Sequence, residues 1–217
     1  QGFDPKIGWE DLAEAAYTLA NPDILWIATN TDQSIPKERG QAPGNGTLVA
    51  AVATASRRTP LVAGKPEAPI VHTAAQAVNS SRPVIVGDRL DTDILGANNA
   101  KMDGALVLTG VQTYQDVIEA VPNQRPTYIL RTLEDFFAPY PEIEVLYEGY
   151  EVTATGPTWQ ARVRGENLSL TGPEIEDSEA FAGSESEAEA WRVACAAWWA
   201  ANPEQGARPN IQGIPGA

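Results

Sequence analysis

The sequence predicts an α/β fold around a parallel sheet, and three patterns along the chain support this fold class. Between residues 61 and 137, short apolar runs alternate with segments of helical periodicity. One run, residues 84–86, is β-branched throughout and ends at Gly87-Asp88, as expected of a strand buried on both faces. Beyond residue 141 the pattern becomes the two-residue alternation of a β-hairpin, so a smaller unit of a different kind follows.

The first 59 residues predict two helices, a strand and a long loop. Apolar residues recur at helical spacing over 9–20, and Asn21-Pro22 ends that helix. Residues 24–28 are typical of a short buried strand, and the alanine-rich residues 47–57 of a second helix. Residues 29–46, rich in Asn, Asp, Pro and Gly, are expected to form a loop, and loops of this length are often functional. The alternative is a surface insertion.

Residues 61–137 carry the predicted sheet. Its strands are expected at 61–63, 83–86, 104–108 and 127–130. Helices are expected at 67–78, 92–99, 114–120 and 133–137, with Pro66 in the first turn of the first helix. Because right-handed crossovers join such strands, we expect all four in one parallel, helix-flanked sheet.

Residues 145–217 predict a β-plus-helix appendage without a recognisable chemical motif. Alternating residues on either side of Gly156-Pro157 indicate a hairpin. A helix over 187–201 places Trp191, Cys195 and Trp198 on one face, which is typical of a buried stripe rather than of a cofactor site. Residues 208–217 are expected to fray.

Composition excludes several classes of function. The formal net charge is −14 over 217 residues, whereas nucleic acids and anionic membranes select basic surfaces. No apolar run approaches the roughly 20 residues that a membrane helix needs. The single cysteine and the single histidine, His72, argue against a disulfide framework, a zinc site and a Ser-His-Asp triad. We therefore expect a cytoplasmic protein without a nucleic-acid or membrane partner, and a homo-oligomer stays open.

Two polar motifs at predicted strand ends indicate a site for phosphate and metal. Gly64-Lys65-Pro66 follows one strand, and Asp88 follows another, with Asp91 and Asp93 in the next helical turn. Ligands bind outside the carboxyl ends of strands in open α/β sheets. Carboxylates bind a hard cation such as Mg²⁺, and a metal and a lysine together neutralise phosphate oxygens. The alternatives are that Asp88 is a turn or N-cap residue and that Lys65 only forms ion pairs with nearby acids.

These motifs resemble those of a known family. Gly64-Lys65-Pro66, followed by VGDRLDTDI at 86–94, is similar to motifs III and IV of the haloacid dehalogenase (HAD) superfamily of phosphatases. The upstream ATNTD at 28–32 and PGNG at 43–46 resemble the class IIA subgroup with an inserted α/β cap. That subgroup includes p-nitrophenyl phosphatases, phosphoglycolate phosphatases, pyridoxal phosphatases and NagD-type sugar phosphatases. The resemblance covers roughly residues 1–145.

The resemblance implies a Mg²⁺-dependent phosphatase of a small phosphorylated metabolite and assigns roles to five residues. Lys65 would order the nucleophile and the transferred phosphoryl group. Asp88 would be a Mg²⁺ ligand, and Asp93 would stand at the metal or hold its water shell. Asn30 and Asp32 would lie on a cap loop that faces the substrate.

The same resemblance implies three segments with a Rossmann-like HAD core in the middle. Residues 1–59 would be part of the cap, and residues 60–144 the C-terminal half of the core with motifs III and IV. Residues 145–217 would be a C-terminal extension that consists of a hairpin and a Trp-rich helix.

The nucleophile of this family is missing from the sequence. It is the first aspartate of an Asp-x-Asp motif that follows an apolar strand, and the spacing recurs only in Asp91-Thr92-Asp93, at a helix start inside motif IV. Because a phosphoaspartyl intermediate needs that carboxylate, we expect the chain to be an N-terminally incomplete fragment of a phosphatase and to be inactive alone. The alternatives are a non-catalytic HAD-like binding module and a phosphoryl transferase with an acceptor other than water.

Overall fold

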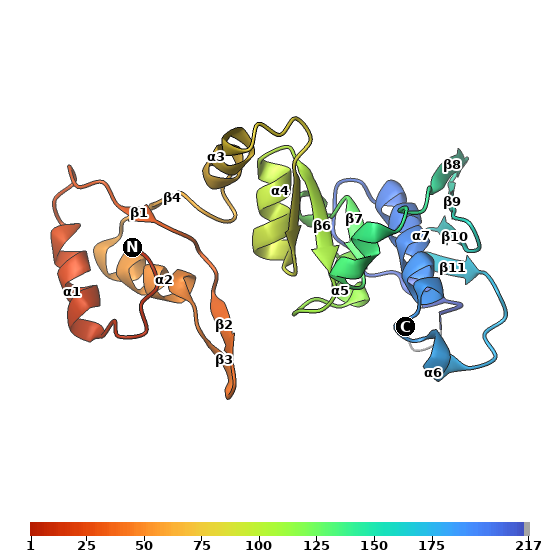
Figure 1. Cartoon of the computed structure of the whole chain (residues 1–217), viewed down its shortest axis with the longest axis horizontal. Coiled ribbons are helices and arrows are strands. Elements are labelled where there is room, and N and C mark those ends of the chain that lie inside the picture. The colour runs from red at the N-terminus through yellow and green to blue at the C-terminus, as the bar shows by residue number, and fades with distance from the viewer. Residues whose placement is uncertain (215–217) are drawn as a thin grey trace. The chain divides into compact units, whose positions relative to one another are not determined.

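The computed structural model describes residues 1–214, which divide into two compact units (Figure 1). The first unit comprises residues 1–85 and 91–102, and the second comprises residues 86–90 and the chain from residue 103 onward. Helices and strands alternate through both units, so the predicted α/β class is confirmed. None of the helices within residues 1–214 is long and apolar enough to span a bilayer.

In the first unit, two helices cover one face of a small parallel sheet. Strand β1 (Ile27–Ala28) pairs with β4 (Leu61–Val62), and helices α1 (Trp9–Thr18) and α2 (Asn45–Ser56) pack against each other. Ala28 and Val62 contact the helices, in a cluster completed by Leu12, Ala15, Leu19, Trp26, Val49, Val52 and Ala53. Their neighbours along the strands, at positions 27 and 61, are 40% and 57% exposed. One face of this sheet is therefore open in this chain.

The position of β4 corrects the sequence prediction. Residues 61–63 were expected in one sheet with the later strands, whereas β4 pairs only with β1 in the part of the chain that the structure describes. A strand of two residues carries no local signal of its partner, so periodicity could not reveal this pairing. The helix that follows, α3 (Pro69–Ala77), begins at Pro69 and not beside Pro66 as predicted.

The expected loop over residues 29–46 also differs from the prediction, because it contains a hairpin. Strand β2 (Ser34–Lys37) pairs antiparallel with β3 (Gly40–Pro43). Gly40 lies at the turn of the hairpin and has a φ of 119°. A residue with a side chain would be strained in this backbone conformation. The first unit is completed by α4 (Leu95–Asn99) and by most of η1 (Leu90–Ile94), a π-helical turn.

Three strands form a sheet in the order β5 (Val84–Gly87), β6 (Asp103–Val107), β7 (Tyr128–Leu130). Strands β6 and β7 and the second half of β5 belong to the second unit. Strands β6 and β7 are parallel, as predicted. Their connection contains helix α5 (Tyr114–Ile118) and the short turn η2 (Pro122–Gln124), and η3 (Leu133–Phe137) follows β7. The strands lie within one or two residues of the predicted positions, because their apolar runs are buried in β6 and β7.

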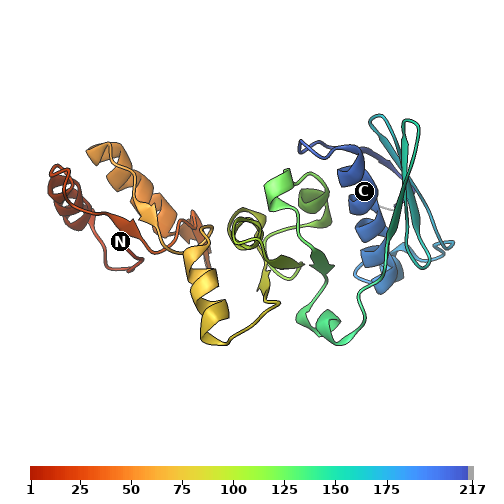
Figure 2. The same cartoon turned by 90° about the horizontal axis from the view of Figure 1, so that it is seen from above.

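The C-terminal residues form a five-stranded sheet with a long helix on one face. Strands β8 (Glu144–Glu148), β9 (Glu151–Thr155), β10 (Gln160–Arg164) and β11 (Asn167–Thr171) form an antiparallel meander. Helix α6 (Ser178–Phe181) precedes α7 (Glu185–Ala201), and Figure 2 shows α7 in blue along the teal strands. The predicted stripe is confirmed, since Trp191, Cys195 and Trp198 are at most 5% exposed.

The last strand corrects the prediction of a frayed terminus. Strand β12 (Asn210–Gln212) pairs parallel with β11, so residues 210–212 are part of the sheet. Residues 215–217 lie outside the described residues.

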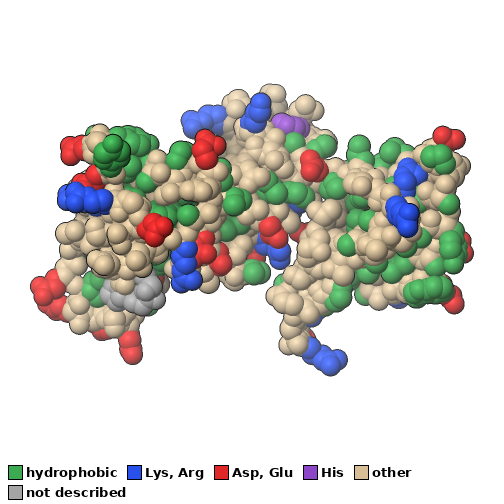
Figure 3. Space-filling view, turned by 180° about the vertical axis from the view of Figure 1, so that it is seen from behind, with side chains coloured by type: hydrophobic (Ala, Val, Ile, Leu, Met, Phe, Trp, Pro, Cys, Tyr) green, Lys and Arg blue, Asp and Glu red, His purple; other side chains and the backbone are tan. Residues whose placement is uncertain are grey.

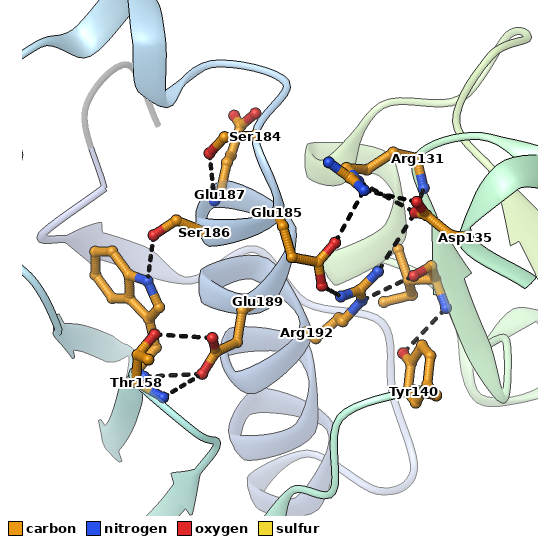
Figure 4. Close-up of polar contacts among 12 residues, drawn as sticks. Arg131, Asp135, Tyr140, Thr158, Ser184, Glu185, Ser186, Glu187, Glu189 and Arg192 are labelled. Carbon is orange, nitrogen blue, oxygen red and sulfur yellow. Dashed lines mark hydrogen bonds and ion pairs between the residues drawn. The ribbon is translucent and has the colours of Figure 1, made fainter. Parts of the chain in front are cut away.

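A buried polar network fixes α7 to the edge of the core sheet (Figure 4). Arg192, only 3% exposed, donates from Nε to the carbonyl oxygen of Ile129 in β7 over 2.9 Å. Its guanidinium pairs with Glu185 and lies 3.7 Å from the carboxylate of Asp135. The hydroxyl of Tyr140 accepts the Ile129 N–H over 3.1 Å. The outward-facing backbone groups of Ile129 are therefore paired, although β7 is an edge strand.

Candidate functional site

The loop that carries Lys65 is bound to the loop that follows β1. The backbone of Gly64 approaches the carbonyl oxygen of Thr29 so closely that a Cβ at position 64 would lie 1.9 Å from it. The carbonyl oxygen of Lys65 accepts hydrogen bonds from the backbone N–H and from the hydroxyl of Thr31, at 3.3 and 3.4 Å. The two loops therefore leave the paired ends of β1 and β4 side by side.

The structure brings Lys65 together with Asp93, one of the predicted acidic residues. Lys65 Nζ lies 2.7 Å from Asp93 Oδ1, and the Asp93 side chain is only 5% exposed while that of Lys65 is 51% exposed. Asp93 lies in η1, and the neighbouring Asp91 is exposed. A buried carboxylate thus orients a lysine whose ammonium group still reaches solvent. This geometry suits a lysine that binds phosphate, and it equally fits the simpler ion-pair interpretation.

Asp88 follows β5 directly, as the sequence predicts, and belongs to the second unit. Its half-buried carboxylate packs against Gly110, where a Cβ would lie 2.0 Å from Asp88 Oδ2. Sequence reasoning missed Gly110, and the only signal was a glycine just after the predicted strand at 104–108. Asp88 therefore has a defined place at a strand end, beside a residue that must stay small.

Asn30 and Asp32 form a pair on the loop after β1. Asn30 Nδ2 donates to Asp32 Oδ2 over 2.8 Å, and Thr31 between them is the residue bonded to the Lys65 carbonyl. Within the first unit, the structure thus brings Asn30, Asp32 and Lys65 into one cluster of loops. An amide beside a carboxylate offers both donors and acceptors to neighbouring hydroxyl groups.

Asn45, which sequence reasoning did not select, lies directly behind this pair. It is 1% exposed and donates from Nδ2 to the carbonyl oxygen of Asn30 over 2.8 Å. The Oδ1 atoms of Asn30 and Asn45 are buried without a hydrogen-bond partner among residues 1–214. The sequence signal for Asn45 was the PGNG motif at 43–46. This motif was used only as a mark of similarity to the class IIA subgroup, and Asn45 was assigned no role.

Two further observations concern clusters of possible metal ligands and the single histidine. No cluster of three or more His, Cys, Asp or Glu side chains that could hold a metal ion occurs among residues 1–214. His72 is exposed on α3, and Figure 3 shows a histidine side chain at the surface.

Comparison with known proteins shows that the chain is similar to HAD-like hydrolases and to phosphatases. Residues 62–136 match the profile of the HAD-hydrolase-like family. The chain is 42% identical to the D-glycerol 3-phosphate phosphatase of Mycobacterium tuberculosis over 183 residues, which cover 82% of this chain and 48% of that protein. It is 43% identical to the glycerol-3-phosphate phosphatase of Gallus gallus over 120 residues, which cover 54% of this chain and 38% of that protein.

The chain is also similar in structure to solved phosphatases. The crystal structure of a glycerol phosphate phosphatase from Mycobacterium tuberculosis in complex with magnesium matches with a TM-score of 0.75 and 34% identity. That match covers 98% of this chain and 58% of the solved chain. A thermostable NPPase from Geobacillus stearothermophilus matches with a TM-score of 0.55 and 36% identity, over 62% of this chain and 52% of its own. The chain therefore spans about half the length of the curated relatives that it matches.

Proposed function

The chain belongs to the HAD-like hydrolases, and on this premise we propose that it is part of a Mg²⁺-dependent phosphatase of small phosphorylated metabolites. The proposed substrates are phosphate esters of short polyols, with glycerol 3-phosphate as the first to test, because relatives from two organisms carry glycerol-3-phosphate phosphatase as their name. The proposed reaction passes through an aspartyl-phosphate whose nucleophile lies outside this sequence.

One observation supports the proposal: the loop that carries Lys65, which we propose to bind phosphate, is hydrogen-bonded to the loop that carries Asn30 and Asp32. The Lys65 ammonium, oriented by Asp93, can neutralise phosphoryl oxygens, on which negative charge is spread during transfer. Asn30 and Asp32 flank Thr31, which donates a hydrogen bond to the Lys65 carbonyl. Their paired side chains can bind the hydroxyl groups of the alcohol part of the ester.

The Asp88 side chain fits Mg²⁺ chemically. Its carboxylate offers the oxygen ligands that this cation prefers, and Mg²⁺ is commonly bound by one or two carboxylates together with water and phosphate oxygens. We propose Asp88 as a direct ligand of the metal and Asp93 as the residue that orients Lys65. A bound Mg²⁺ would supply charge neutralisation at the phosphoryl group.

The edge position of β5 leaves room for a further strand beside it. In the described part of the chain β5 has a strand neighbour, β6, on one side only, although its apolar sequence is typical of a strand inside a parallel sheet. We propose that a strand ending in Asp-x-Asp pairs with this edge in the complete protein and supplies the nucleophile. In the same proposal, residues 1–59 and 60–144 keep their assignment to cap and core, and residues 145–217 remain an extension.

Hydrolysis assays with a Mg²⁺ titration test this function. The complete protein is expected to hydrolyse glycerol 3-phosphate, and the 217-residue chain is expected to release no phosphate. In the complete protein, Asp88→Asn and Lys65→Met are expected to lower kcat about 100-fold or more, in line with the loss of one electrostatic contact to the transition state. The exposed Asp91→Asn is the matched control and should change kcat less than about threefold.

Two outcomes would contradict the proposal. Turnover by the 217-residue chain that Asp88→Asn abolishes would show that the nucleophile lies within it. A complete protein that binds phosphate esters without hydrolysing them would favour the second candidate, a non-catalytic binding module, which the absence of an Asp-x-Asp strand end from this sequence also favours. Product analysis would identify transfer to an acceptor other than water.

A further inference from the structure

We propose that Asn45 is a positioning residue that fixes the Asn30–Asp32 pair relative to Lys65, so that the alcohol and phosphate parts of the substrate are recognised by one rigid group of loops. The proposal rests on the proposed function for its substrate, but the structural coupling stands without it. All of the residues concerned belong to the first unit.

The first step of the argument is the contact between Asn45 and the recognition loop. Asn45 is the first residue of α2, and its side chain is 1% exposed. Its Nδ2 donates 2.8 Å to the carbonyl oxygen of Asn30 and lies 3.4 Å from the carbonyl oxygen of Gln1. A polar side chain this deeply buried is retained only with such partners. The first of them is the backbone of a residue proposed to bind substrate.

The second step is the backbone contact made by the glycines on either side of Asn45. The Gly46 N–H donates to the Asp32 carbonyl over 2.8 Å, and the Gly44 N–H donates to the Gln33 carbonyl over 2.9 Å. A Cβ at Gly44 would lie 2.3 Å from the Asp32 carbonyl oxygen. The start of α2 therefore lies directly against the loop, and only glycine allows that distance.

The third step connects this arrangement to the lysine. Thr31 lies between the two recognition residues and donates from both its backbone and its hydroxyl to the Lys65 carbonyl. Lys65 has its own ion pair with Asp93 at 2.7 Å, so the loss of Asn45 is expected to displace the Asn30–Asp32 pair while the ammonium group stays in place. We call Gly44, Asn45 and Gly46 the buttress of the recognition loop.

The test uses an isosteric variant and a second, smaller one. Asn45→Ala removes the side chain and its hydrogen bond, while Asn45→Asp keeps the shape but sets a buried carboxylate oxygen against the Asn30 carbonyl oxygen in place of the donor. In the complete protein, Asn45→Ala is expected to raise KM for glycerol 3-phosphate about tenfold, as fits one lost buried hydrogen bond, and Asn45→Asp is expected to raise it by at least as much. The values of kcat/KM for p-nitrophenyl phosphate, which lacks hydroxyl groups on its alcohol part, should stay within about twofold.

Thr54→Ala is the matched control, because Thr54 lies on the same helix and its hydroxyl bonds only within it, to the Ala50 carbonyl at 2.8 Å. This variant should leave both substrates unchanged. Equal effects of the Asn45 variants on the two substrates, or no effect on either, would overturn the proposal, since a merely structural residue does not distinguish them.

Hydrogen exchange of the 217-residue chain gives a readout that does not depend on activity. Asn45→Asp is expected to speed exchange at the Gly44 and Gly46 amides about tenfold, whereas the Arg57 amide, bonded to Ala53 at the other end of α2, should keep its rate. Unchanged protection at both glycines would overturn the coupling. If the complete protein hydrolyses neither ester, the proposed function fails, and exchange still decides whether Asn45 holds the loop.

Discussion

Replacing Arg192 by methionine measures how much the polar network between α7 and β7 stabilises the second unit. The variant leaves the buried carbonyl oxygen of Ile129 without its 2.9 Å donor, which costs about 1–3 kcal/mol. It also removes a cation–π contact with Tyr140 at 5.0 Å, worth about 0.5–2 kcal/mol. Asp135 keeps its other arginine partner at 2.7 Å, and the Glu185 side chain is 55% exposed, so no carboxylate is left buried and unpaired. We therefore expect a loss of about 2–4 kcal/mol in the free energy of unfolding.

Urea unfolding followed by tryptophan fluorescence measures this loss, because four of the six tryptophans (159, 191, 198 and 199) lie in the second unit. Arg164→Met is the matched control: its side chain is 80% exposed and pairs with Glu151 at 2.7 Å, so its removal should cost less than about 1 kcal/mol. Similar losses in the two variants, or less than about 0.5 kcal/mol for Arg192→Met, would refute the assigned role of the network.

Two further predictions concern titratable side chains of the same unit. Cys195 is fully buried, and burial raises the pKa of its thiol, so a thiol reagent should label it only after unfolding; rapid labelling of the folded protein would contradict its place in the core. The hydrogen bond from Arg131 lowers the pKa of Asp135 below its usual value of 3.8, so this carboxylate stabilises the fold above about pH 4, and the stabilisation is lost as the pH falls through the lower folded-state pKa. Asp135→Asn should therefore flatten the acid-induced fall in stability in urea titrations below pH 4, and an unchanged slope would count against this linkage.

Local patterns predicted most of the secondary structure, because burial imposes its periodicity directly on the sequence. The stripe of Trp191, Cys195 and Trp198 marks the buried face of α7, and the alternation around Gly156-Pro157 marks the β9–β10 hairpin. Both signals arise within one element or between neighbours in the chain. They need no knowledge of which distant segment covers the apolar face.

Pairings between distant segments were not accessible in the same way. The β1–β4 pair joins residues more than thirty positions apart, and two-residue strands have no pattern that could select a partner. The β2–β3 hairpin has few residues that favour strands. Its two ends are joined by a hydrogen bond from the Gly44 N–H, just before α2, to the Gln33 carbonyl. Asn45 and Gly110 were missed for a related reason, since each acts by lying against a residue that is remote in sequence.

The candidate site could be predicted in its parts but not in its assembly. Lys65 was expected beside the carboxylates that follow the strand at 83–86, and the structure places one of these, Asp93, 2.7 Å from the lysine. The expected reason was wrong, however: Lys65 follows β4, and β4 is not in the sheet that contains β5. The link between Lys65 and the Asn30–Asp32 loop follows from the β1–β4 pairing, which sequence patterns did not reveal.

Residues 145–217 have no recognisable motif in the sequence, yet their helix α7 packs against β7, an edge strand of the three-stranded sheet. Besides Arg192, α7 contributes Trp199, whose Nε1 donates to the Ile118 carbonyl in α5 over 3.2 Å. In return, Arg125 donates to the carbonyl oxygens of Asn202 and Gln205 just beyond the end of α7, at 2.7 and 2.9 Å. Removing the extension would thus leave the edge of β7 open and several buried groups without partners, so this part of the chain stabilises the core strand next to β6 whatever else it does.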